Sequence, residues 1–71
     1  MEMIRVKDPI SGKEISLEGP LEYKELREKI KKAFNYKFDG FLLVSEAKIL
    51  EEQENVSRGT VHIIVLSPLG R

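Results

Sequence analysis

The sequence contains no cysteine and no tryptophan, and its charges cancel. The absence of cysteine excludes disulfides, thiolate nucleophiles and cysteine-based metal sites, so the fold must be held together by packing. Twelve Lys and Arg residues against twelve Asp and Glu residues give a net charge of zero. A neutral chain lacks the electrostatic attraction that drives non-specific binding to nucleic acid, so nucleic acid is not expected as a partner.

Long hydrophobic runs are also missing. No apolar segment approaches the ~20 residues that span a bilayer, and Met1 to Arg5 lack the basic region and apolar stretch of a signal peptide. The sequence therefore predicts a cytoplasmic protein without a membrane partner. Because the chain has 71 residues and no repeat or linker, we expect residues 1–71 to form a single small domain.

Periodic patterns predict the elements of the first half. Residues 3–7 and residues 14–18 each alternate apolar and polar side chains, as half-buried strands do. The turn residues of segment 8–12 suit a hairpin loop between them, so the chain should open with an antiparallel hairpin. An amphipathic helix is predicted from about Tyr23 to Phe34. Its apolar positions are Tyr23, Leu26, Ile30 and Ala33.

The second half contains short apolar segments and no further helical pattern. Residues 41–44 form an apolar run flanked by turn residues, which predicts a strand but leaves open which side chains face outward. A short edge segment around Ile49 and Leu50 follows, and a final strand covers residues 60–66. One helix in a chain of this size can cover only one face of a sheet. The predicted fold class is therefore α+β with a half-covered sheet.

The final strand carries apolar residues on both faces, because side chains alternate between faces along a strand. The two sets are Val61, Ile63 and Val65 on one face and His62, Ile64 and Leu66 on the other. A small domain has one core. One set must therefore meet a second layer, a partner protein or water.

Five segments carry a resemblance to a known family. They are Val6-Lys7, Gly12 to Glu18, the helix positions Leu26 to Ile30, the region Leu43 to Leu50 with Lys48, and Thr60 to Val65. In this order they resemble the ubiquitin-like β-grasp family, and the likeness covers most of the chain. It implies a mixed sheet of four to five strands with one helix packed on one face. It also implies that the last strand lies between the first strand and the strand at 41–44.

The resemblance implies a function as well. In ubiquitin the outward sheet face is the main patch that partners bind, which suggests a non-enzymatic protein that binds other proteins. We expect the chain itself to be a monomer or a weak homodimer. The corresponding residues here are Ile10, Val44, His62 and Ile64, with Leu42 and Leu66 as apolar neighbours. Two alternatives stay open: self-association through this face, or a strand register that hides part of the set.

No residue pattern indicates catalysis. The chain has no nucleophile beside a base, no glycine-rich phosphate loop and no paired carboxylates in a plausible cleft. His62 is the only histidine, and no cysteine or neighbouring carboxylate supports it as a metal ligand or general base. We expect no catalytic residue, no metal site and no cofactor.

The C-terminal tail departs from the family pattern. Ubiquitin and the prokaryotic sulfur carriers end in Gly-Gly, whereas this chain ends in Leu69-Gly70-Arg71. In those proteins the terminal glycine carboxylate is adenylated and then passed to sulfur or to a lysine. The alternative function is therefore a small protein modifier or sulfur carrier, activated at its C-terminal carboxylate after removal of Arg71.

Mass spectrometry of the chain from its native source separates these two functions. A carrier or modifier should show loss of Arg71 together with a thiocarboxylate on Gly70, or Gly70 joined to a lysine of another protein. The binding function requires neither change. Finding only the full-length, unmodified chain would contradict the carrier hypothesis.

Overall fold

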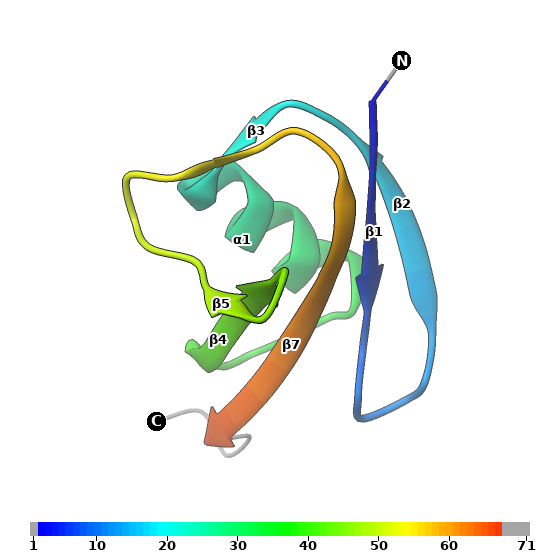
Figure 1. The fold of residues 1–71 in the computed structure, drawn as a ribbon. Helices are drawn as coiled ribbons and strands as arrows, with labels where there is room; N and C mark the ends of the chain where they lie inside the picture. The colour runs from blue at the N-terminus through cyan, green and yellow to red at the C-terminus, as the bar shows by residue number, and fades with distance from the viewer. Residues whose placement is uncertain (1, 68–71) are drawn as a thin grey trace.

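A computed structural model describes residues 2–67, which form one helix and seven strands (Figure 1). The predicted hairpin, helix and final strand are all present. In chain order the elements are β1 (Met3–Lys7), β2 (Glu14–Glu18), β3 (Leu21–Glu22), α1 (Tyr23–Ala33), β4 (Gly40–Ser45), β5 (Lys48–Ile49), β6 (Asn55–Val56) and β7 (Gly59–Ser67).

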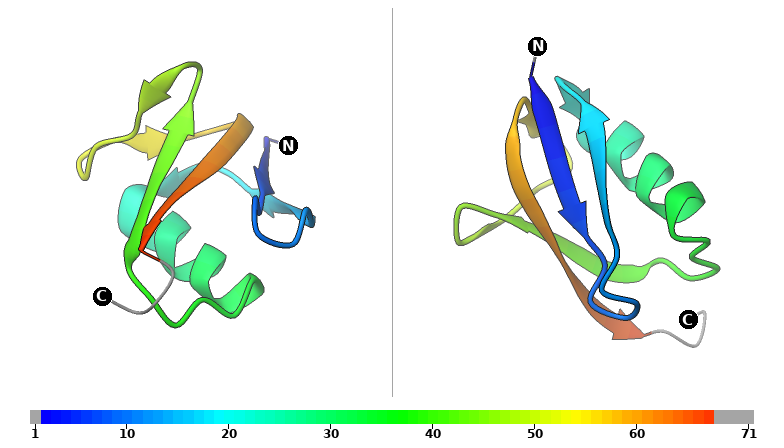
Figure 2. Two further views of the ribbon diagram at one scale, coloured as in Figure 1. Left: turned by 90° about the horizontal axis from the view of Figure 1, so that it is seen from below. Right: turned by 90° about the vertical axis from the view of Figure 1, so that its right-hand side faces the viewer.

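Five of the strands form one mixed sheet in the order β2-β1-β7-β4-β5. The central strand β7 runs parallel to β1 and antiparallel to β4. Figure 2 shows α1 on one side of this sheet, while no described element covers the other side. The mixed sheet with one covered face agrees with the prediction. A separate two-stranded ladder, β3 with β6, was not predicted.

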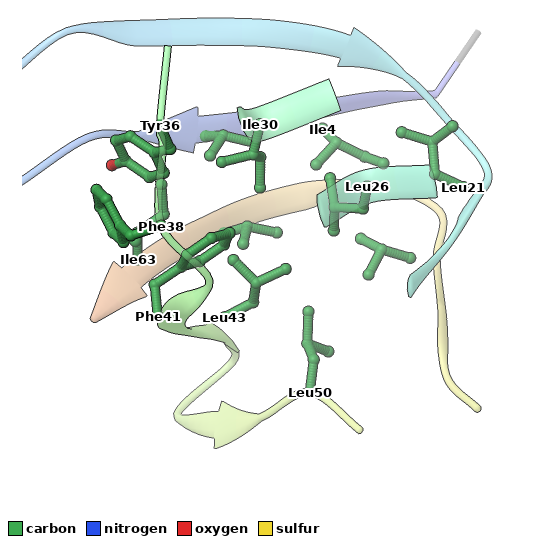
Figure 3. Close-up of a cluster of buried hydrophobic side chains, with 13 residues drawn as sticks. Ile4, Leu21, Leu26, Ile30, Tyr36, Phe38, Phe41, Leu43, Leu50 and Ile63 are labelled. Carbon is green, nitrogen blue, oxygen red and sulfur yellow. The ribbon is translucent and has the colours of Figure 1, made fainter. Parts of the chain in front are cut away.

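The core lies between α1 and the covered face of the sheet (Figure 3). Alternate residues of β1 and β7 point into it, including Ile4, Val6 and Val61, which are fully buried. Leu26 and Ile30 of α1 meet them from the other side and are also fully buried. Each fully buried aliphatic side chain stabilises the fold by about 1.5–3 kcal/mol relative to an exposed one.

An aromatic cluster closes the core beyond the C-terminal end of α1. Asn35 adopts a φ of 56°, a left-handed conformation that asparagine tolerates and that ends the helix. The chain then turns back, and the rings of Tyr36 and Phe38 stack with centroids 4.6 Å apart. Phe41 at the start of β4 packs edge-on against Tyr36 at 5.3 Å. Residues 36–39 form neither helix nor strand, yet they supply two core residues, Tyr36 and Phe38.

The helix buries a slightly different face from the predicted one. Ala33 is exposed, whereas Arg27 lies under the start of β4. Its guanidinium carbon lies 3.9 Å from the centroid of the Phe41 ring, and the group donates hydrogen bonds of 2.8 Å to the carbonyls of Phe41 and Asp39. Arg27 therefore fastens the helix to the sheet. Among residues 2–67, no helix is long and apolar enough to cross a membrane.

Replacing Arg27 tests this contact. The change Arg27→Lys should lower the free energy of unfolding by about 1–3 kcal/mol, because lysine cannot serve both carbonyls and the ring face together. The matched control Arg5→Lys, at an exposed position on β1, should change it by less than about 0.5 kcal/mol. Chemical denaturation measures both. Equal effects would show that Arg27 has no anchoring role.

Candidate interaction surface

The uncovered face of the sheet is built around the outward residues of β7. Val61 and Ile63 are buried and Val65 is half-buried, while His62, Ile64 and Leu66 are exposed, as the alternation predicts. The sheet register places Leu42 of β4 opposite Ile64 and Val44 opposite His62. Partners opposite each other in a sheet point to the same face, so these four side chains form one surface.

Three large aliphatic side chains stand out on this surface. Ile64 is 45% exposed and Leu66 is 62% exposed, and Ile49 of β5 is 52% exposed. Ile49 lies opposite Val44 in the register, which extends the surface to the sheet edge. We call this surface the outer patch. It consists of Leu42, Val44, Ile49, His62, Ile64 and Leu66.

Sequence reasoning missed Ile49. The residue was expected on a short edge segment, but a two-residue strand has no period from which to read its face. Its position opposite Val44 supplies the missing information, and that position requires knowledge of the register. The same register answers the question left open for residues 41–44: Phe41 and Leu43 face the core, whereas Leu42 and Val44 are half-buried on the outer face.

Ile10 is the one nominated residue that does not come from β4 or β7. It sits in the loop between β1 and β2 and is 60% exposed. Together with Phe34, Tyr36 and Phe38, it lines a cavity between this loop and the end of α1. The strand pairing that places the β4 and β7 residues on one surface does not include Ile10, so its part in partner binding stays a prediction.

The loop that carries Ile10 is held by a buried carboxylate. Asp8, which is only 3% exposed, accepts hydrogen bonds from the backbone N–H groups of Ile10 and Ser11 and from the Ser11 hydroxyl. It also accepts a hydrogen bond from the hydroxyl of Tyr36, which follows the helix. This last contact connects the hairpin loop with the aromatic cluster.

The environment of Asp8 shifts two pKa values in opposite directions. Burial raises the pKa of the carboxyl, but the hydrogen bonds from Tyr36, Ser11 and Ile10 together outweigh it, and the net pKa lies below the usual 3.8. Burial raises the pKa of Tyr36, and the hydrogen bond to the Asp8 carboxylate raises it further. Asp8 is therefore ionised and Tyr36 protonated at neutral pH, the combination in which the phenol donates.

Two further predictions concern the C-terminal tail and metal binding. Leu69, Gly70 and Arg71 lie outside the described residues, so the structure says nothing about the tail. Within residues 2–67, no three His, Asp or Glu side chains are grouped so that they could hold a metal ion.

Comparisons with known proteins address the fold. No protein-family model matches the chain, and no curated protein matches it. The N-terminal ubiquitin-like domain of the 4931431F19Rik protein is similar in structure, with a TM-score of 0.69, 23% sequence identity, and coverage of 93% of this chain and 75% of the other. A computationally designed protein based on human erythrocytic ubiquitin has a TM-score of 0.71, 21% identity and coverage of 94% of both chains. The fold is therefore a ubiquitin-like β-grasp.

The change Asp8→Asn tests the buried carboxylate. It should lower the free energy of unfolding by about 1–3 kcal/mol at pH 7. Asparagine places an NH₂ group, which is a donor, where Asp8 presents a carboxylate oxygen to the donors around it. Folding lowers the pKa of Asp8 below 3.8, so the wild type has this extra stability above about pH 3.8 and loses it as the pH falls through the folded value. The difference between the two proteins should shrink over that range.

Denaturation curves from pH 7 down to acid measure this difference. The matched control Glu52→Gln, an exposed carboxylate in the loop after β5, should follow the wild type at every pH. A difference between Asp8→Asn and wild type that stays constant in acid would contradict the assignment.

Proposed function

We propose that this ubiquitin-like protein binds other proteins through the outer patch and has no catalytic activity of its own. The single observation that carries the proposal is the grouping of Ile49, Ile64 and Leu66. All three are about half exposed or more, and they lie on the one sheet face that no described element covers. We place this function in the cytoplasm, as the sequence predicts.

Exposed aliphatic side chains in one place favour a partner. Burying apolar surface contributes about 25 cal/mol for each Å² removed from water. Single exposed leucines are common on folded proteins, whereas neighbouring ones on a small domain are often part of an interaction site. The register makes Ile64 and Leu42 neighbours, and likewise Val44 and Ile49.

The shape of the surface favours a protein over a small molecule. Small ligands bind in concave pockets that enclose most of their surface. The outer patch is instead formed by side chains that stand on neighbouring strands of a sheet, and β7 is held on both edges by β1 and β4. Such a surface is already in place before binding, so ordering it costs little of the binding free energy.

The change Ile64→Ser tests the patch. The immobilised wild-type chain should first be used to capture proteins from an extract of its source cells. Each captured protein is then purified, and its affinity for the chain is measured by calorimetry. We expect Ile64→Ser to weaken binding at least about fivefold, since truncating a central interface residue costs more than ~1 kcal/mol. The matched control is Ala33→Ser, an exposed position on α1, which should keep wild-type affinity.

Two results would argue against this function. One is an unchanged affinity for Ile64→Ser, which would place the contact elsewhere. The other is retention of nothing except further copies of the chain, with a dimer at micromolar concentration that Ile64→Ser abolishes, because the patch would then serve self-association.

A further inference from the structure

The outer face of the sheet has a charged half beside its apolar half. The outward residues of β1 and β2 are four charged side chains, Arg5, Lys7, Glu14 and Glu18, together with Met3 and Ser16, and all six are exposed. The register aligns one row of outward side chains across all five strands, in the order Glu14, Lys7, His62, Val44 and Ile49. Along this row the surface changes from acidic to basic and then to apolar.

The two cations of β1 form no ion pair within residues 2–67, although Lys7 lies opposite Glu14 in the sheet register. Both described ion pairs lie elsewhere, between Lys31 and Asp39 and between Lys48 and Glu54. Within residues 2–67, therefore, no carboxylate lies within 4.0 Å of Arg5 or Lys7.

The opposite side of the patch offers no comparable positive charge. Lys48 of β5 lies opposite Ser45, on the other side of the sheet from Val44 and Ile49. Its ammonium group is 3.0 Å from the carboxylate of Glu54. Within residues 2–67, the outer patch is thus flanked by cations that form no ion pair along β1, and by no such cation along β5.

We propose that the partner of the outer patch is a protein segment with an apolar stripe and with Asp or Glu side chains along the flank that meets β1. This inference rests on the proposed function and adds the chemistry of the partner. Carboxylates above β1 would form charge-assisted hydrogen bonds with Arg5 and Lys7 while the apolar stripe covers Ile64 and Val44. The reverse orientation would bring those carboxylates to the apolar edge at Ile49.

The acidic residues of β2 favour a narrow segment over an anionic membrane. Neighbouring strands lie about 4.8 Å apart, so the row of β2 is roughly 10 Å from the row of β7. A helical segment about 10 Å wide, centred between β7 and β4, reaches β1 with its flanking side chains and stops short of β2. A flat anionic surface would instead meet Glu14 and Glu18 together with the two cations and be repelled by them.

Binding of three synthetic helical peptides to the full chain tests the proposal. The peptides share one leucine stripe and differ in a single flank, which carries Glu, Gln or Lys. At low salt, wild type should bind the Glu peptide about three- to tenfold more tightly than the Gln peptide, and the Lys peptide least. This preference should shrink as the salt concentration rises.

Charge reversal on β1 provides the more decisive comparison. The double variant Arg5→Glu with Lys7→Glu should invert the order, so that the Lys peptide binds best. The matched control carries Lys29→Glu and Lys32→Glu on α1, which change the net charge equally at exposed positions away from the sheet face. This control should keep the wild-type order.

The outcomes separate the two proposals. If all three peptides bind wild type equally and Ile64→Ser weakens each of them, the patch binds proteins but the acidic partner is wrong. If no peptide binds, or if Ile64→Ser changes none of the affinities, the proposed function fails as well. Tighter binding to phosphatidylserine vesicles than to the Glu peptide, lost on charge reversal of β1, would assign a membrane surface instead.

Discussion

The structure depends on the position of β7 in the middle of the sheet. Its backbone pairs with β1 on one edge and with β4 on the other, so its side chains cannot turn from one face to the other without breaking both ladders. Val61 and Ile63 therefore fill the core, and Ile64 and Leu66 must stand on the opposite face. Because a single helix covers only one face, the apolar surface outside follows directly from how the sheet is assembled.

Two polar contacts connect the sheet to the segments packed against it. Arg27 connects α1 to the first residues of β4. Asp8 connects the β1–β2 loop to Tyr36, which packs into the aromatic cluster. Both contacts lie on the helix side or at the end of the sheet, and neither uses a residue of the outer patch. The two contacts can therefore hold the sheet in place without involving the patch residues.

Much of the fold could be predicted because it rests on repeating patterns. The hairpin, α1 and the two faces of β7 each follow a period of 2 or 3.6 over several residues. The missed features have no such period. The ladder of β3 and β6 has two residues per strand, and Tyr36 enters the core from a segment with turn residues. Arg27 is half-buried because it packs over Phe41, although its charge predicts exposure. Ile49 can be assigned to the outer patch only once the pairing of β5 with β4 is known, and that pairing cannot be read from a two-residue strand.

The most direct measurement of the outer patch is a map of backbone amide signals in ¹⁵N-labelled protein titrated with a purified partner. If the patch is the binding surface, shifts and broadening should concentrate at Val44, Ile49, His62 and Ile64, while the amides on the exposed side of α1, such as Lys29, stay in place. Perturbations centred on α1, with the β7 amides unmoved at saturation, would contradict binding through the sheet face.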